Sequence, residues 1–200
     1  MKYLILFLLI TSFAQAKNID ISTKIYENGK IKTEYITNNL YTTQKDYYEN
    51  GQLKRVTSFK NNTVDGIVKN YFQNGVLHTQ GVYKNGKKDG RFKEYSKEQR
   101  IKVSGSFKND KKDGVFKVYN KDGSVQSKGR YKNGQKDGVF KRYYSNERVE
   151  LESRYKNDVQ HGKTRLYYER GGIESEAIYE NGKQIKITKY MPNGREIYEF

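Results

Sequence analysis

The chain has 200 residues, of which 39 are basic and 23 acidic, and its formal net charge at pH 7 is +16. It has no cysteine, which excludes disulfide bonds and any chemistry that depends on a thiol. A positive field of this size favours anionic partners: phosphate-bearing lipids, acidic glycans, nucleic acid or an acidic protein. Only 34% of the residues are hydrophobic, but 19 tyrosines and 9 phenylalanines argue against a disordered chain.

The first predicted element is a signal peptide over residues 1–16. Lys2 gives a positive start, residues 4–13 are an apolar run, and a small-x-small triplet ends at Ala16. The apolar run is too short to span a bilayer. The alternatives are a buried N-terminal strand and an uncleaved anchor. We expect cleavage near Ala16 and an exported protein, in the periplasm, on the cell surface or secreted, that does not span a membrane.

The rest of the chain is predicted to be one array of repeats in two parts. Residues 17–58 hold degenerate and first repeats, and residues 59–200 hold a regular array with a period of 24 residues. A fixed period of this length indicates one supersecondary unit that is repeated side by side. One aromatic position and one glycine position mark each unit, and we expect them to be structural anchors. The anchors are Phe59, Tyr83, Phe107, Tyr131, Tyr155, Tyr179, Gly66, Gly90, Gly114, Gly138 and Gly162.

Each unit is predicted to be a pair of antiparallel strands. One turn signal follows the aromatic-Lys pair, as at Asn85-Gly86, and a second lies half a unit away, as at Asn74-Gly75. Both are typical of two-residue hairpin loops. Two such turns per unit leave strands of about eight to ten residues and no room for a helix. The expected fold class is all-β: an elongated single-layer antiparallel β-meander of tandem hairpins of about 24 residues, after the signal peptide.

Counting outward from the turns predicts which side chains share a face of the sheet. With a two-residue loop at 74–75, Phe72 is expected opposite Leu77, and Val68 opposite Gly81. The first face then carries the aromatic anchors and a column of large residues, each opposite a small one. It also carries an aliphatic column: Leu53, Leu77, Ile101, Val125, Val149 and Ile173.

The second face is predicted to be polar, basic and rich in tyrosine. A basic residue precedes a tyrosine by two positions in five successive units: Lys69, Tyr71, Lys93, Tyr95, Lys117, Tyr119, Lys141, Tyr143, Arg165 and Tyr167. This is the candidate partner-binding face, because ammonium groups and tyrosine rings together suit phosphates, sulfates and carboxylates. The alternatives are that the basic residues only keep an open sheet soluble, and that the tyrosines only pack over the hairpin ends.

No catalytic, cofactor or metal site is predicted. His78 and His161 occupy different phases of the repeat, and His161 replaces the aspartate of an Asp-Gly turn. Aspartates recur once per unit, as at Asp65 and Asp89, so equivalent carboxylates on alternate strands stand roughly 10 Å apart. Calcium needs its oxygen ligands much closer together than this. Turn chemistry is therefore the favoured role of the aspartates.

These motifs resemble the MORN repeat family in its bacterial variant form. Residues 71–77 are YFQNGVL, residues 83–90 are YKNGKKDG, and residues 47–53 are a further copy. The resemblance implies an elongated meander used for protein or lipid contact. Many bacterial members carry the label of YwqK-type toxin–antitoxin antitoxins. Eukaryotic relatives occur beside phosphatidylinositol phosphate kinases, but no kinase motif is present here.

Three functions follow from the sequence. The first is an exported, non-catalytic module that binds a protein or an anionic surface, a lipid headgroup or an acidic glycan, through the Tyr/Lys face. The second is a YwqK-type antitoxin, which requires that the chain and a protein toxin share a compartment. The third is a structural spacer of the envelope. Nucleic acid is disfavoured as the partner of an exported protein, and the oligomeric state is open because the sheet has free edges.

Overall fold

The computed structural model describes residues 19–197, which form eighteen β-strands and no helix. There is consequently no helix in this range that is long and apolar enough to cross a membrane. The signal peptide expected over residues 1–16 lies outside the described residues. The chain divides into two compact units, Met1–Gln99 and Arg100–Phe200. The all-β antiparallel fold is confirmed, while the division at residue 58, which rests on repeat regularity, stays a prediction.

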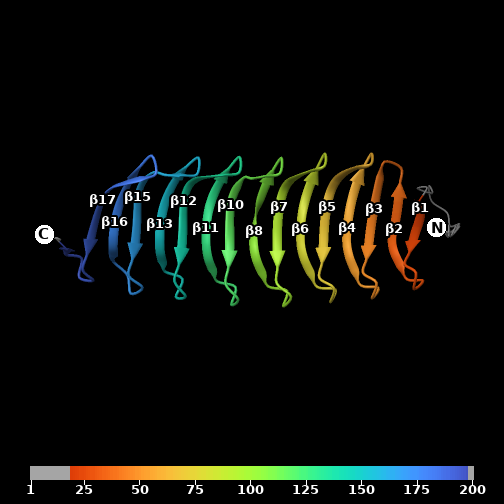
Figure 1. The fold of residues 1–200 in the computed structure, drawn as a ribbon, viewed down its shortest axis with the longest axis horizontal. Helices are drawn as coiled ribbons and strands as arrows, with labels where there is room; N and C mark the ends of the chain where they lie inside the picture. Colours follow the sequence, from red (N-terminus) through yellow and green to blue (C-terminus); the bar gives the residue numbers. More distant parts are fainter. Residues whose placement is uncertain (1–18, 198–200) are drawn as a thin grey trace, which may run out of the picture. The chain divides into compact units, whose positions relative to one another are not determined.

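The first unit is an open antiparallel meander in which each strand pairs with its neighbours in sequence (Figure 1). Its strands are β1 (Ile19–Ile25), β2 (Ile31–Asn38), β3 (Tyr41–Tyr47), β4 (Leu53–Lys60), β5 (Thr63–Tyr71), β6 (Leu77–Lys84) and β7 (Lys87–Tyr95).

The second unit repeats this arrangement, with two strands interrupted. β8 pairs with both β9 and β10, and β13 pairs with both β14 and β15, because the ladder breaks at Asp113 and at His161. The strands are β8 (Ile101–Lys108), β9 (Lys111–Lys112), β10 (Gly114–Tyr119), β11 (Val125–Lys132), β12 (Gln135–Tyr143), β13 (Val149–Lys156), β14 (Val159–Gln160), β15 (Gly162–Tyr167), β16 (Ile173–Glu180), β17 (Lys183–Tyr190) and β18 (Glu196–Ile197).

The turn after each aromatic-Lys pair is a two-residue loop, as predicted. Lys84 pairs with Lys87 across Asn85 and Gly86, whose φ angles are 50° and 80°. Positive φ at both central residues defines a type I′ turn, which matches the twist of the flanking strands. Asparagine tolerates the left-handed region better than most residues with a side chain, which explains why it recurs at this position.

The other turn is one residue longer than predicted. The amide of Phe72 donates to the carbonyl of Val76 at 2.8 Å, and the amide of Gly75 donates to the carbonyl of Phe72 at 2.9 Å. The loop therefore has three residues, 73–75, and Gly75 takes a φ of 83°, as in a type I turn that ends on a left-handed glycine. His78 then has no partner in the ladder of β5 and β6. This bulge absorbs the extra residue.

The bulge moves one predicted column to the other face. Tyr71, and not Phe72, pairs with Leu77, whereas Val68 still pairs with Gly81 as predicted. Directly opposed residues project to the same side of a sheet, so the aliphatic residues lie with the tyrosines of the second face. The placement of these residues on the first face is wrong at five positions, where the pairs are Tyr47–Leu53, Tyr71–Leu77, Tyr119–Val125, Tyr143–Val149 and Tyr167–Ile173.

The recurring Asp-Gly pairs lie at irregular points inside strands and not at turns. Between the pairs Tyr83–Lys88 and Gly81–Phe92 the register shifts by two residues, and Gly90, at this point, has a φ of 130°. A Cβ at Gly90 would lie 2.9 Å from a neighbouring side chain. Because the shift is an even number of residues, Phe92 stays on its predicted face.

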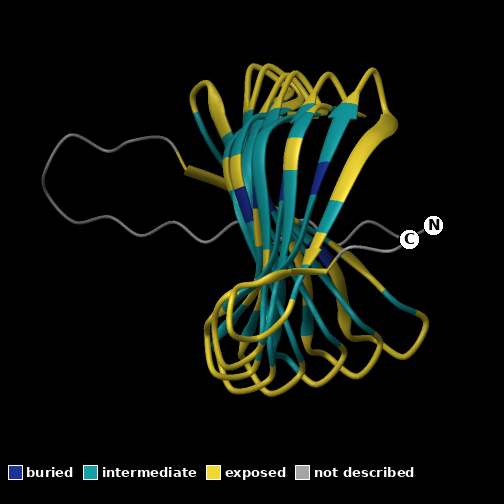
Figure 2. Cartoon of the chain, turned by 90° about the vertical axis from the view of Figure 1, so that its left-hand side faces the viewer, coloured by how far each residue is buried: buried dark blue, intermediate teal, exposed yellow. Residues whose placement is uncertain are grey.

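Each unit has a thin core, because the sheet forms a single layer. Most strand residues are half-buried and most turn residues are exposed (Figure 2). On the first face, Phe140 lies between Gly129 and Ser153 on the adjacent strands. Ring centroids of consecutive aromatic side chains lie 5.2–5.4 Å apart in edge-to-face contact. The rings in this row are Phe107, Phe116, Tyr131, Phe140 and Tyr155.

Candidate binding surfaces

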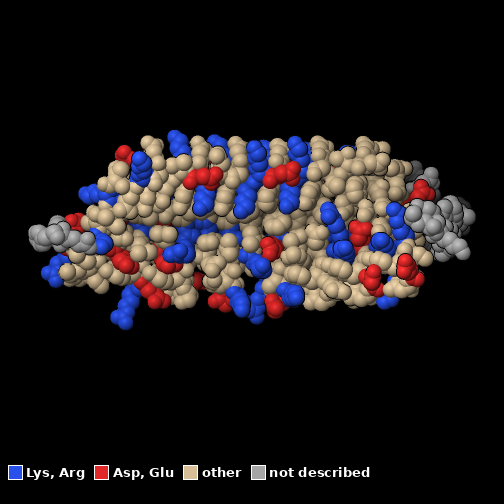
Figure 3. Space-filling model, in the orientation of Figure 1, with Lys and Arg blue, Asp and Glu red and all other residues tan. Residues whose placement is uncertain are grey.

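The predicted Tyr/Lys face carries three lysines side by side in the second unit. Lys117 pairs with Lys128, and Lys128 pairs with Lys141. These residues lie on the adjacent strands β10, β11 and β12, which are about 4.8 Å apart, and directly opposed residues share a face. We call Lys117, Lys128 and Lys141 the lysine row. Figure 3 shows that basic side chains recur along the visible face among fewer acidic ones.

Carboxylates neutralise the same face beyond the lysine row. Glu152 Oε2 lies 2.8 Å from Lys141 Nζ, and Glu176 lies 2.7 Å from Arg165 Nε and 2.8 Å from Lys163 Nζ. The hydrogen bond to Glu152 raises the pKa of Lys141. Hydrogen bonds from Lys163 and Arg165 lower the pKa of Glu176. Within the lysine row these ion pairs therefore neutralise Lys141 and leave the other end of the row without a carboxylate partner among the described residues.

That end consists of Lys117 and Lys128. Within residues 19–197 neither side chain forms an ion pair. Lys128 Nζ lies 5.5 Å from the ring centroid of Tyr143, a cation–π distance. Tyr119 Oη lies 3.1 Å from Ser104 Oγ. Two predicted lysines, Lys117 and Lys141, thus lie on either side of Lys128, which was not among the predicted residues. The hydroxyl of Tyr119 and the ring of Tyr143 already have contacts within the sheet.

The second-face tyrosines also pack against the displaced aliphatic column. Tyr71, Leu77 and Tyr95 line a shallow hollow of about 570 Å³ in the first unit. Burial raises the pKa of Tyr71. All five predicted tyrosines of this face are half-buried. Packing over the hairpin ends and contact with a partner are therefore both open to these rings.

The corresponding row of the first unit is less basic. Lys45 Nζ lies 2.8 Å from Glu34 Oε2, and the hydrogen bond to Glu34 raises the pKa of Lys45. The predicted residues Lys69 and Lys93 both lie opposite Gln80. The predicted residues of the first unit are therefore not brought into a cluster of like charge.

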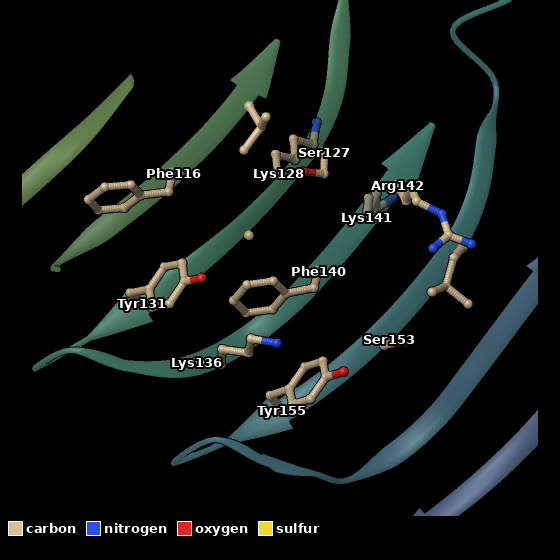
Figure 4. Close-up of a pocket in the computed structure, with 13 residues that line it drawn as sticks. Phe116, Ser127, Lys128, Tyr131, Lys136, Phe140, Lys141, Arg142, Ser153 and Tyr155 are labelled. Atoms are coloured by element: carbon tan, nitrogen blue, oxygen red, sulfur yellow. The ribbon is translucent and has the colours of Figure 1, made fainter. Parts of the chain in front are cut away.

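A cavity that the sequence did not predict lies on the first face of the second unit (Figure 4). It measures about 280 Å³. Phe116, Tyr131, Phe140 and Tyr155 line it, and Lys136 Nζ lies 5.3 Å and 4.7 Å from the ring centroids of Phe140 and Tyr155. The signal in the sequence is the alternation of large and small residues at the 24-residue period, because each small residue leaves a gap between two rings.

A further group of tyrosines, also not singled out from the sequence, links neighbouring hairpins. Tyr48 Oη donates to the carbonyl of Tyr71 at 2.8 Å, and Tyr144 Oη donates to the carbonyl of Tyr167 at 2.6 Å. Tyr26 and Tyr168 make equivalent bonds to residues 47 and 190. A doubled tyrosine, at 47–48, 143–144 and 167–168, marks three of these four positions, whereas Ile25 precedes Tyr26. The first member of each doubled tyrosine lies on the Tyr/Lys face, and the second reaches the next repeat.

The aspartates and histidines have structural contacts. Asp65 Oδ2 accepts a hydrogen bond from the amide of Asn85 at 3.1 Å, so the carboxylate supports the adjacent turn. His78 stacks on Phe72 with ring centroids 4.1 Å apart. No group of three potential metal ligands occurs among residues 19–197.

Comparison with known families identifies the repeat. The family described as MORN repeat variant matches residues 41–61, 64–85, 112–133, 136–157 and 160–181, which together make up more than half of the chain. Each match covers one hairpin and ends at or within a type I′ turn. No curated protein matches the sequence. The interval 86–111 is not matched, and its turn has Gln99 at a φ of 62°, where most other hairpins have glycine.

Proposed function

The chain belongs to the MORN repeat variant family, whose repeats form binding modules, and on this premise we propose that it is an exported module that binds an acidic protein or an anionic surface through its Tyr/Lys face. The observation that carries the proposal is the lysine row. Three lysines stand in register on adjacent strands, and a carboxylate, that of Glu152, pairs with only one of them, Lys141. We propose no catalytic activity.

The lysines of the row repel one another because they carry like charge. At the spacing of adjacent strands, about 5 Å, two ammonium groups would repel each other by roughly 1 kcal/mol even at the dielectric constant of water. A phosphate, sulfate or carboxylate group placed over the lysine row removes this repulsion and gains attraction to three cations. The gain is sensitive to salt, because screening acts over about 8–10 Å at physiological ionic strength.

The test compares two triple variants of equal net charge. The first changes Lys117, Lys128 and Lys141 to Gln, and the control changes Lys108, Lys132 and Lys156, which are exposed residues beside the type I′ turns, to Gln. Binding to phosphatidylglycerol vesicles and capture of acidic envelope proteins are measured over a salt series. We expect loss of binding in the first variant only. Equal loss in both variants would show that net charge alone acts, which would refute the proposal.

The other two functions that the sequence raises give different results. A YwqK-type antitoxin relieves the toxicity of its partner when both are expressed in one compartment. A spacer without a ligand captures nothing above background at any salt concentration.

A further inference from the structure

The first strand of the described chain has an open edge. Within residues 19–197, β1 pairs with β2 and with no other strand. Six of its seven residues are exposed. Among them are Ile19, Ile21 and Ile25, which are 57%, 47% and 47% exposed. An exposed, apolar edge strand with free backbone donors and acceptors is a template for pairing with another strand.

The charges of β1 are arranged symmetrically about its centre. Asp20 and Lys24 lie two residues before and two residues after Ser22, so all three project to one face. Lys24 Nζ lies 5.7 Å from the ring centroid of Tyr35 on β2, which places Lys24 on the same face as this ring. Asp20 has no ion pair among the described residues.

This arrangement is complementary to itself. When two copies of β1 run antiparallel about a two-fold axis at Ser22, Asp20 of each copy lies opposite Lys24 of the other. Ile19 of each copy then lies opposite Ile25 of the other, on the reverse face. A two-fold interface of this kind uses the same patch twice, and every favourable contact occurs twice.

The last long strand of the second unit, β17, lacks this property, and it also pairs with the short strand β18 at Lys189 and Tyr190. β17 carries Lys183, Lys186 and Lys189 and no acidic residue. Antiparallel pairing of two copies of β17 about Lys186 would place lysine opposite lysine at every charged position. Lysines on an edge are a common way in which proteins block strand addition. β1 and β17 thus differ in charge complementarity: the charges of β1 favour antiparallel pairing with a second copy, and those of β17 oppose it.

We propose that the chain forms a two-fold dimer by antiparallel pairing of β1 with β1 of a second copy, with the register fixed by two Asp20–Lys24 pairs between the copies. Backbone hydrogen bonds and the isoleucine contacts supply the affinity. Exposed ion pairs add little free energy, but like charges directly opposite each other are destabilising, so the ion pairs select the register. The dimer presents two lysine rows, which strengthens binding to a surface that carries many anionic groups.

Charge reversal tests the dimer without changing the buried part of the fold. The mass of the purified chain is measured by sedimentation equilibrium over a dilution series. Asp20→Lys alone and Lys24→Asp alone each place two like-charged pairs in the interface, and we expect a dimer Kd that is roughly tenfold higher or more. The double variant Asp20→Lys/Lys24→Asp restores both pairs, so it regains the original Kd.

Mixing the two single variants gives the sharpest result. One copy then has lysine at both positions and the other has aspartate at both, so an equimolar mixture forms a heterodimer, whereas each variant alone stays largely monomeric. Lys186→Asp on β17 is the control and leaves the dimer Kd unchanged. A chain that is monomeric at every concentration overturns the proposal. So does a dimer whose Kd is the same for all variants.

Discussion

Left-handed backbone positions show how much one side chain matters in a repeat. At the third loop position of the longer turn, most repeats have glycine, as at Gly75 and Gly123, with φ angles of 83° and 93°. Gln99 and Glu147 occupy the equivalent positions with φ angles of 62° and 63°. A residue with a Cβ pays roughly 1 kcal/mol in this region. Those two hairpins are therefore locally strained where the others are not.

Replacing Glu147 by glycine is expected to stabilise the second unit. Relief of the left-handed strain is partly offset by the greater freedom of glycine in the unfolded chain, which leaves a gain of about 0.5 kcal/mol. The free energy of unfolding in urea measures the effect. Glu147→Ala is the control, since it removes the same carboxylate and keeps the Cβ. A gain of equal size in the alanine variant would point to charge and not to backbone strain.

Glu176 gives a prediction on pH dependence. Hydrogen bonds from Lys163, which has the larger effect, and from Arg165 lower the pKa of Glu176 in the folded chain. A lowered pKa contributes stability above the unfolded value, which is about 4.3, and this stability is lost as pH falls through the lower folded value. The difference in unfolding free energy between the native chain and Glu176→Gln should therefore shrink from pH 7 to pH 3. Glu169→Gln, at an exposed turn residue, should show a smaller change, and a difference for Glu176→Gln that is independent of pH would contradict the ion pairs.

At the scale of the strand pair, the fit of rings over small residues differs between equivalent positions. A Cβ at Gly129 would lie 2.0 Å from a ring atom of Phe140, whereas a Cβ at Gly81 would be 3.5 Å or more from its nearest neighbours. Neither glycine has a left-handed φ. The ring of Phe140 is held between Tyr131 and Tyr155, with centroids 5.3 Å and 5.2 Å away. It therefore has little freedom to move aside.

Alanine at these two positions should have very different effects. We expect Gly129→Ala to destabilise the second unit by about 1–3 kcal/mol through overpacking. Gly81→Ala should change stability by less than about 0.5 kcal/mol, because its Cβ makes ordinary van der Waals contacts. The midpoint of urea unfolding measures both. Equal effects would show that the ring of Phe140 can move aside. Contact with a ring would then not be the reason why small residues recur at these positions.

Most of the strand pattern could be predicted from the sequence, and the misplacement of the aliphatic column has one physical cause. The pairs Val68–Gly81 and Lys84–Lys87 are as predicted. Leu77 is on the wrong face because an Asn-Gly dipeptide suits both a two-residue type I′ loop and a longer loop in which only the glycine is left-handed. The choice depends on backbone hydrogen bonds such as that from Phe72 to Val76, which the dipeptide does not specify.

The candidate sites were predictable to a smaller extent, because side-chain pairing depends on neighbouring strands. The lysines and tyrosines of the second face were found from the period alone. Which lysines are neutralised depends on Glu152 and Glu176, whose cross-strand partners follow from the register. The cavity beside Phe140 was missed because its rings already had a structural explanation. A repeat pattern identifies the recurring position, and the structure shows where one copy differs from the next.

At the scale of the whole chain, pairing between sequence neighbours governs how stability is distributed. Among residues 19–197, the strands of each unit pair only with strands that adjoin them in sequence, apart from the two interrupted ladders. The stability of such an array is approximately a sum of repeat terms and nearest-neighbour terms. A local defect should therefore weaken its own hairpins and leave distant ones unchanged.

Hydrogen exchange in the Gly129→Ala variant tests this directly. The clash with Phe140 loosens β11 and β12, so amides in β10 to β13 should exchange faster, by roughly the factor that corresponds to the measured loss of stability. Amides in β3 to β5 belong to the first unit and share no pairing with these strands, so their exchange should stay within error of the native chain. Gly81→Ala provides the matched control, with little change anywhere. A uniform acceleration across both units would instead mean that the chain opens as a single cooperative block, and nearest-neighbour terms would no longer describe its stability.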